Sequence, residues 1–348
     1  MITFYNYRHH LHQGKQEMFR GQMVPCFERA ARVDHVLSEL HGRKLGDILA
    51  PAQWDSTVLA SIHAPEYLRF LERAWDDWVA LDPGNTQHDA LPSVWPNHGM
   101  RLDVLPDNFA ARMGRYAFDT GSPLTSGTWT AAREGAFCAI SAAHVVADGA
   151  RAAFALSRPP GHHAGADFFG GYCFLNNAAL AAQALRDKGM ERVAILDVDY
   201  HHGNGTQAIF YDRSDVLFAS IHGDPKTEYP FFLGHADETG TGAGAGFNFN
   251  LPLPRGTGFA VWREALRLAL RRIADFRPQG LVVSLGLDTF EGDPISGFQL
   301  GTKDFFAVGH DIACADLPTV FVFEGGYAVA QLGVNAVNVL EGFERWAG

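Results

Sequence analysis

Two apolar segments of the chain end in acidic and histidine side chains, a combination that can hold a metal ion. The first continues as Ile195-Leu-Asp-Val-Asp-Tyr-His-His-Gly-Asn-Gly205, which places Asp197, Asp199 and His201 at alternate positions. In a strand, alternate side chains share one face, so an Asp and a His two residues apart can reach one ion. Burying unpaired carboxylates is costly without a cation or strong hydrogen-bond donors. The pattern therefore favours a metal site, the alternative being a strand end closed by salt bridges.

The second segment, Leu281–Leu287, ends in Asp288. Taken alone, this carboxylate could equally well be the N-cap of a following helix. Together with Asp199 and His201 it completes a set of two carboxylates and one imidazole. Three protein ligands leave at least one coordination position open, which is typical of catalytic rather than structural zinc.

Two further motifs carry groups that could move protons or donate hydrogen bonds. The rigid turn Arg158-Pro-Pro-Gly-His-His-Ala164 presents His162 and His163 together, which favours general acid and base catalysis. The alternative is a pair of histidines packed in the core. Near the C-terminus, Phe323-Glu-Gly-Gly-Tyr327 lets the backbone turn sharply, so the Tyr327 phenol could donate to a developing oxyanion.

Short β-branched segments alternate with helical patterns from about residue 150, and they must position these side chains. Such alternation predicts a parallel sheet covered by helices, with ligand sites beyond the carboxyl ends of the strands. The predicted strands are Arg151–Leu156, Val193–Val198, Val216–Ile221, Leu281–Leu287 and Thr319–Phe323, and the clearest helices are Asn176–Lys188 and Phe259–Phe276. The N-terminal third is expected to be helical, with a long loop at about 81–113 after it. His9, His10 and His12 are expected at the surface.

Composition excludes several classes of function. With 348 residues, 47% of them hydrophobic, the chain can bury a large core as one or two domains. Its apolar runs are too short to cross a bilayer, and Met1–Gln16 lacks the apolar stretch of a signal peptide, so we expect a cytoplasmic protein without a membrane partner. A formal charge of -11 opposes binding to nucleic acid. The four cysteines form no Cys-x-x-Cys spacing, which argues against a zinc knuckle.

Taken in order, these motifs resemble the arginase and histone deacetylase superfamily, most closely its bacterial acetylpolyamine amidohydrolase branch. The similarity extends through Phe169-Gly-Gly-Tyr-Cys-Phe-Leu-Asn-Asn177, Ser220-Ile-His-Gly-Asp-Pro225 and Thr289-Phe-Glu-Gly-Asp-Pro-Ile-Ser296. It implies one α/β catalytic domain over residues 1–348, with an eight-stranded parallel sheet flanked by helices on both faces. The segment at about 81–113 would be a long insertion loop in that domain.

The resemblance also implies roles for individual residues. The zinc ligands would be Asp199, His201 and Asp288, and the catalytic residues His162, His163, Asp197, Asn204 and Tyr327. In the implied mechanism zinc and Tyr327 polarise the acetyl carbonyl, and His163 takes a proton from the attacking water and passes it to the leaving amine. Asp197 would keep His162 cationic and Asn204 would orient His163. A structural potassium ion is implied at Asp197, Asp199, His201, Ser220 and Ile221.

The implied activity is zinc-dependent deacetylation of acetylated polyamines or small diamines such as acetylputrescine and acetylcadaverine. The alternatives are a protein or peptide lysine deacetylase and a non-catalytic, ligand-binding member of the fold. A binuclear manganese site, as in the ureohydrolases of the superfamily, would need an Asp-x-Asp pair, whereas this chain has Asp288-Thr-Phe290. One zinc ion per chain is therefore expected, although iron could use the same ligands.

Substrate contacts are also implied by the resemblance. The expected substrate-binding residues are Glu17, Gly171, Tyr172 and Tyr229, with the two tyrosines as aromatic tunnel walls. Two acidic residues of the relatives coincide here with Ala110 and Gly121, leaving Asp107 and Asp119 as unaligned candidates for holding a distal ammonium. The 81–113 loop is expected to form a homodimer that narrows the entrance.

Overall fold

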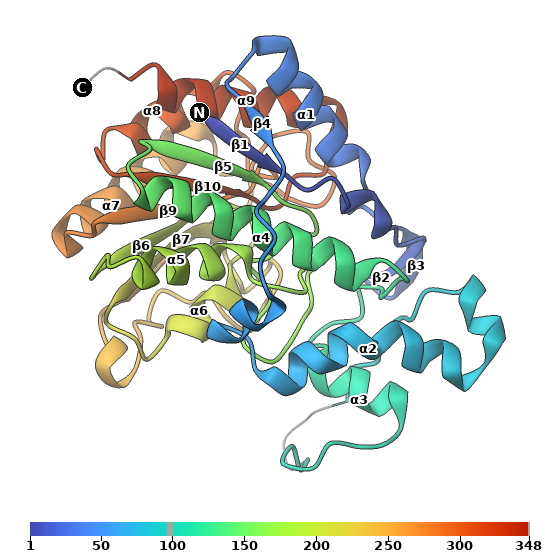
Figure 1. Ribbon diagram of the computed structural model, residues 1–348. Coiled ribbons are helices and arrows are strands. Elements are labelled where there is room, and N and C mark those ends of the chain that lie inside the picture. The colour runs from blue at the N-terminus through green and yellow to red at the C-terminus, as the bar shows by residue number, and fades with distance from the viewer. Residues whose placement is uncertain (96–99, 347–348) are drawn as a thin grey trace.

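A parallel eight-stranded sheet forms the centre of the protein (Figure 1). The structure is a computed structural model that describes residues 1–95 and 100–346. The strand order is β4-β1-β5-β10-β9-β6-β7-β8, and every neighbouring pair is parallel. The strands are β1 (Ile2–Tyr5), β4 (Ile48–Leu49), β5 (Ala152–Leu156), β6 (Val193–Asp197), β7 (Val216–Gly223), β8 (Asn248–Leu253), β9 (Gly280–Leu285) and β10 (Thr319–Phe323). A separate antiparallel hairpin contains β2 (Gln16–Phe19) and β3 (Gln22–Pro25).

Helices cover both faces of the sheet, as Figure 1 shows. One face packs against α2 (Pro65–Leu81), α3 (Phe109–Tyr116), α4 (Thr128–Ala147), α5 (Asn177–Asp187) and α6 (Asn204–Phe210). The other packs against α1 (Ala31–Arg43), α7 (Phe259–Phe276), α8 (Asp304–Ala313) and α9 (Val329–Glu344). Short 3-10 helices span His9–Leu11, Ser56–Ser61, Pro83–Gln87 and Gly242–Gly244. The predicted fold, an eight-stranded parallel sheet between two helical layers, is confirmed.

The sequence of strand β6 is apolar at successive positions rather than at alternate ones, because both faces of the strand are buried. Val193 and Ile195 join the core cluster on one face, whereas Ala194 and Leu196 join the cluster on the other. A strand buried on both sides needs apolar residues at every position until its end, where Asp197 begins the polar site. The first polar residue of the run therefore marks the edge of the core.

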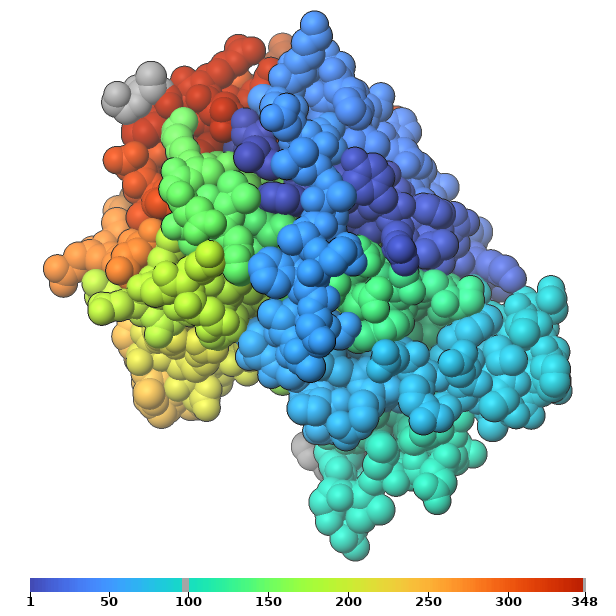
Figure 2. All heavy atoms as spheres, in the orientation of Figure 1, coloured from blue at the N-terminus to red at the C-terminus, as the bar shows by residue number. Residues whose placement is uncertain are grey.

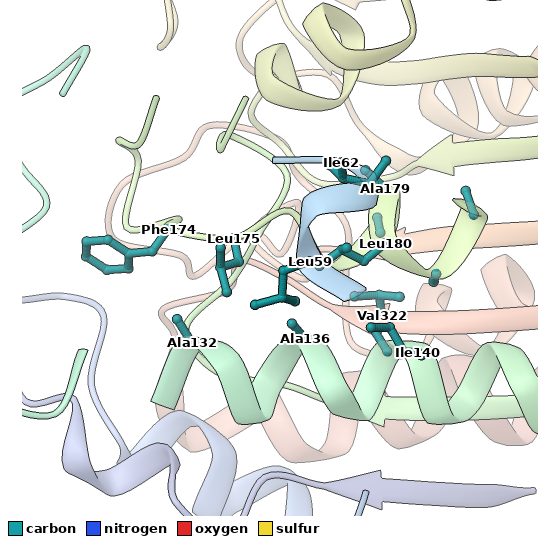
Figure 3. Close-up of a cluster of buried hydrophobic side chains, with 14 of the residues drawn as sticks. Leu59, Ile62, Ala132, Ala136, Ile140, Phe174, Leu175, Ala179, Leu180 and Val322 are labelled. Atoms are coloured by element: carbon teal, nitrogen blue, oxygen red, sulfur yellow. The ribbon is translucent and has the colours of Figure 1, made fainter. Parts of the chain in front are cut away.

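Figure 3 shows how one of these cores supports the loop that follows the histidine turn. Ala132, Ala136 and Ile140 of α4 face Leu180 of α5, and Leu175 packs into the same buried cluster. Phe174 and Leu175 are 0% and 1% exposed. The loop around 169–177 is therefore held by apolar packing although it has little regular structure.

The sequence-based element boundaries were accurate where both faces of an element are buried. The five predicted strands and two predicted helices are all present, with ends shifted by at most two residues. The N-terminal third contains the helices α1, α2 and α3, as expected, but it also contains four strands that were not expected: β1 and β4 pair with the sheet, and β2 and β3 form the hairpin. These strands have two to four residues, too few to produce a readable period.

The expected surface position of His9 and His12 was also wrong. They are 2% and 3% exposed, and His12 bonds through its Nδ1 to the Thr128 hydroxyl at 2.9 Å. Burial lowers the pKa of His12 to about 3, helped by the nearby Arg158 cation, so its ring is neutral. His10 is exposed, as expected.

Residues 81–113 connect α2 to α3 and contain the 3-10 helix Pro83–Gln87 and the first part of α3. Residues 96–99 of this predicted insertion lie outside the described residues. Figure 2 shows that α2, α3 and the described residues between them project from the body of the molecule. Within the described part of the chain, no helix combines the length and the apolar character needed to span a bilayer.

Candidate active site

The predicted metal ligands converge at the carboxyl ends of β6 and β9, which are neighbours in the sheet. Asp199, His201 and Asp288 each place a ligand atom within 4.8 Å of the others. His201 Nδ1 lies 3.3 Å from Asp199 Oδ1 and 2.9 Å from Asp288 Oδ2. Both carboxylates are 0% exposed and His201 is 8% exposed. The three side chains therefore share one buried site, and His201 is its most exposed member.

Backbone groups fix the two carboxylates in place. Asp199 Oδ2 accepts a hydrogen bond from Gly325 N at 2.8 Å, and Asp288 Oδ1 accepts one from Tyr200 N at 2.8 Å. Each carboxylate keeps its other oxygen turned toward His201. Such preorganisation is typical of ligands whose geometry must match an ion.

The donor set fits a divalent ion such as zinc. Two carboxylates and one imidazole nitrogen are ligands that zinc takes in catalytic sites, with a position left for water or substrate. Burial and the adjacent Asp199 charge raise the pKa of Asp288 to about 7, while the two carboxylates raise the pKa of His201 to about 10 against the effect of burial. Both shifts arise because two buried carboxylates are stabilised by a nearby positive charge. A bound dication would supply that charge directly.

His162 and His163 lie side by side with different electrostatic surroundings. Their rings are 4.0 Å apart. His162 Nδ1 lies 3.0 Å from Asp197 Oδ2, and its Nε2 lies 3.8 Å from Asp199 Oδ1. Although burial opposes it, these carboxylates raise the pKa of His162 to about 10, so the ring is cationic at neutral pH.

His163 faces the substrate cavity and has only a neutral partner. Its Nδ1 bonds to Asn204 Oδ1 at 2.7 Å, so the Nδ1 proton is held there and Nε2 is left as the basic nitrogen. Burial, reinforced by the neighbouring His162 and His201 rings, lowers the pKa of His163 well below its usual value. The pKa values of the two histidines are thus shifted in opposite directions, upward for His162 and downward for His163.

The segment after β10 joins the histidine turn, the metal ligands and Tyr327. The Glu324 carboxylate accepts hydrogen bonds from Gly161 N at 2.6 Å and His162 N at 3.2 Å. Tyr327 lines the cavity, and burial raises the pKa of its phenol well above the usual value, so the hydroxyl stays protonated. It can therefore donate a hydrogen bond to a carbonyl oxygen in the cavity.

Arg32 packs against the Tyr327 ring, although no sequence motif singled it out. It is 0% exposed, lies with its guanidinium carbon 4.8 Å from the centre of the Tyr327 ring, and donates to the carbonyls of Glu324 and Gly326. Its charge is paired with Glu28 at 2.9 Å. The signal was present, because Arg32 stands four residues before Val36 on the buried face of α1.

A cavity of about 350 Å³ leads from the surface to His163, His201 and Tyr327. Its walls include all four predicted substrate-binding residues: Glu17, Gly171, Tyr172 and Tyr229. The Tyr229 ring centre lies 5.1 Å from that of His163, and the Tyr172 ring centre 5.6 Å from that of Tyr327. The lining includes the aromatic rings of Phe19 and Phe231 besides these tyrosines, which suits a linear chain of methylene groups.

Two carboxylates hold the phenol walls of the cavity. Tyr172 Oη donates to Glu17 Oε1 at 2.7 Å, and Tyr229 Oη donates to Asp119 Oδ2 at 2.8 Å. Asp119 Oδ2 also accepts from Gly171 N at 2.8 Å, so one carboxylate links both sides of the tunnel. Burial raises the pKa of Glu17 to about 7 and also raises that of Asp119.

The other predicted residues occupy more varied positions. Ser220 lies opposite Asp197 in the β6–β7 register, with Ile221 next to it, and all three are 0% exposed. The Ser220 hydroxyl bonds to His222 Nδ1 at 2.8 Å. Asp107 is exposed and, among the described residues, is absent from the cavity lining, whereas Gly121 lines it.

Comparison with known proteins agrees with this geometry. Residues 26–343 match the histone deacetylase domain. The chain is 52% identical to acetylpolyamine amidohydrolase 2 of Pseudomonas aeruginosa, covering 99% of both chains. It is 46% identical to acetylpolyamine amidohydrolase of Mycoplana ramosa, covering 98% of this chain and 99% of that one.

The chain belongs to the histone deacetylase family. A crystal structure of acetylpolyamine aminohydrolase from Burkholderia pseudomallei superimposes with a TM-score of 0.95, 40% identity and complete coverage of both chains. As a member of the histone deacetylase family at this level of identity, the protein is a hydrolytic, metal-dependent deacetylase. The predicted family and enzyme class are confirmed.

Proposed function

We propose that this deacetylase hydrolyses acetylated polyamines or small diamines, such as acetylputrescine and acetylcadaverine, to the free amine and acetate. One observation carries the proposal. A basic imidazole, a phenol donor and three metal-ligating side chains meet at the end of a cavity of about 350 Å³ with aromatic walls, which suits a linear acetylated amine. The full-length similarity to acetylpolyamine amidohydrolases supports the same substrate class.

One zinc ion is proposed at Asp199, His201 and Asp288. When bound there, it would polarise the acetyl carbonyl and lower the pKa of water in the site. His163 Nε2 would accept the proton of the attacking water and return it to the leaving amine, because Asn204 holds the opposite ring nitrogen. His162 would stay protonated and stabilise negative charge, while Tyr327 would donate to the oxyanion.

A structural potassium ion is proposed at the second predicted site, formed by Asp197, Asp199, His201, Ser220 and Ile221. Its physical motive is the charge of Asp197, which is fully buried and has His162 as its cationic partner. Potassium there would add positive charge behind the metal ligands.

A homodimer through residues 81–113 is also proposed, in the cytoplasm. The described part of this segment exposes many large apolar side chains: Leu81, Leu91, Val94, Trp95, Met100, Leu102, Val104 and Leu105. Monomers rarely expose so many together, and burying them against a second copy would remove them from water. Sedimentation of wild type against a Leu102→Asp/Val104→Asp variant tests this, and a monomeric wild type would contradict it.

Acetate release tests the proposed reaction. Purified protein is given acetylputrescine, acetylcadaverine, acetylspermidine and an acetyl-lysine peptide, each before and after chelation and with zinc or iron restored. We expect chelator-sensitive turnover of the free amines, recovered with zinc, and little turnover of the peptide. Comparable turnover of the peptide would indicate a lysine deacetylase instead. No turnover of any amide with metal restored would contradict the proposal.

A further inference from the structure

The β2–β3 hairpin places opposite charges at two depths of the cavity wall. Glu17 on β2 is 1% exposed and bonded to Tyr172, whereas Arg20 stands in the exposed turn at the hairpin tip. Both residues line the cavity. A substrate that enters therefore passes the Arg20 cation before it reaches the depth of Glu17.

Arg20 occupies a turn position that suits other residues better. Phe19 pairs with Gln22, so the turn has two residues, Arg20 and Gly21, with φ angles of +51° and +81°. Two positive φ angles are the signature of a type I′ turn, whose first position favours Asn, Asp or Gly. An arginine held in the left-handed region is uncommon, and such strain is often found at functional positions.

The carboxylates of the cavity already have partners. Asp119 accepts four hydrogen bonds, from Gly171, Tyr229, Gly121 and Ser122. Glu228 is paired with Arg255 at 3.0 Å. These contacts fix the positions of both carboxylates, and Arg255 balances the charge of Glu228.

The Arg20 charge, by contrast, lies at the exposed tip of the hairpin. Its guanidinium carbon lies 5.0 Å from the centre of the Phe19 ring, which also lines the cavity. Arg20 is the only lysine or arginine among the described residues that line the cavity. No acidic side chain of the described residues forms an ion pair with it, whereas Arg32 and Arg255 are paired with Glu28 and Glu228. The hairpin tip thus adds one positive charge to the outer lining, although the chain as a whole is acidic.

We propose that Arg20 is a specificity-determining residue that disfavours acetylated amines with additional ammonium groups beyond the depth of Glu17. The inference rests on the proposed function and refines its substrate class. The favoured substrates are monoacetylated short diamines, whose single ammonium lies within the cavity. A longer polyamine would bring a second ammonium to the Arg20 guanidinium and be repelled.

The test is the ratio of kcat/KM for acetylspermidine to that for acetylputrescine. Exposed charge pairs typically change an equilibrium by about 1.5- to 5-fold, so Arg20→Asn should raise this ratio about 2- to 5-fold and Arg20→Glu about 4- to 20-fold. Arg20→Lys should keep the wild-type ratio. Because the effect is electrostatic and solvent-exposed, it should largely disappear at about 1 M salt, where the screening length is about 3 Å.

Two controls separate this role from a structural one. Arg20→Asn suits the turn, so its melting temperature should equal or exceed that of wild type while selectivity changes. Arg271→Glu makes the same charge reversal at an exposed position of α7 outside the cavity lining and should leave the ratio unchanged. An Arg20→Glu ratio within twofold of wild type, with acetylputrescine turnover retained, would overturn the inference alone. Absence of acetate release from both amines in wild type would overturn the proposed function and this inference with it.

Discussion

The inner end of the cavity and its mouth are built in different ways. The inner end consists of side chains that directly follow neighbouring parallel strands, such as Asp199 after β6 and Asp288 after β9. The mouth is assembled from the hairpin, which carries Arg20 at its tip and Glu17 further in, the segment with Asp119 and the loop with Tyr229. Because the core fixes the strand ends, the inner end can hold charged groups at catalytic distances. The mouth depends on side-chain hydrogen bonds between loops, and we expect it to tune affinity rather than chemistry.

The largest effect should come from a substitution among the proposed metal ligands Asp199, His201 and Asp288. Asp288→Asn removes one of two buried carboxylates and leaves an amide, which is a poor zinc ligand. We expect loss of bound zinc and at least about 1000-fold lower kcat, comparable with removal of a whole catalytic unit. Metal content by mass spectrometry and acetate release measure this. Full zinc occupancy with near-normal kcat would exclude Asp288 as a ligand.

The second-largest loss of activity should come from Tyr327→Phe. The change keeps the ring that stacks on Arg32 and removes only the hydroxyl. Loss of one oxyanion donor costs about 100- to 1000-fold in kcat, with little change in KM. Tyr172→Phe is the matched control, because it also removes a phenol from the lining but one that is bonded to Glu17. If both variants lost kcat equally, the special role of Tyr327 would be contradicted.

Asp119 tests whether the mouth acts through positioning. Asp119→Ala removes the acceptor that joins Gly171 to the Tyr229 phenol, so we expect about a 10- to 100-fold lower kcat/KM, mainly through KM. Tyr229→Phe breaks only one of these bonds and should cost about 2- to 10-fold. In the double variant the losses should be less than additive, since both act on one contact. Additive losses would show that Asp119 and Tyr229 act independently.

The same contrast explains what could be predicted from the sequence. Asp199, His201 and Asp288 were predictable because parallel strands bring their carboxyl ends together, so local motifs imply a shared site. The partners of Asp119 lie 52 and 110 positions away, at Gly171 and Tyr229, and no local pattern connects them. For this reason Asp119 was expected only as an unaligned candidate for holding an ammonium, and its hydrogen bonds to Gly171 and Tyr229 were not predicted. Burial of His12 was missed for a similar reason, because Thr128 is 116 positions away.

Arg32, Glu28 and Glu324 show a second limit of sequence analysis. Each is a charged residue that composition assigns to the surface, yet each is at most 4% exposed. Their burial is possible because Arg32 bonds to Glu28, while Glu324 accepts two backbone hydrogen bonds. Such compensation depends on tertiary contacts between α1, the histidine turn and the segment after β10. It becomes visible only when the chain is folded.

The smallest expected effect concerns the pH dependence of substrate affinity at the mouth. Burial raises the pKa of Glu17 to about 7, whereas that of His162 at the inner end is about 10. Glu17 is therefore neutral below pH 7 and negative above it, while His162 stays cationic from pH 6 to 8. For a cationic diamine, the ratio of KM for Glu17→Gln to KM for wild type should rise about 3- to 10-fold over that range. Other titrations affect both proteins and cancel in the ratio.

Stability gives an independent measurement of the same pKa. An acid whose pKa is higher in the folded than in the unfolded protein makes folding less favourable as pH rises from about 4.5 to about 7. The melting temperature of Glu17→Gln relative to wild type should therefore increase between pH 4.5 and pH 8, because glutamine has no such proton to lose. If neither the KM ratio nor the difference in melting temperature changed with pH, Glu17 would have an ordinary pKa. Substrate affinity at the mouth would then not depend on pH between 6 and 8, just as the charge of His162 does not.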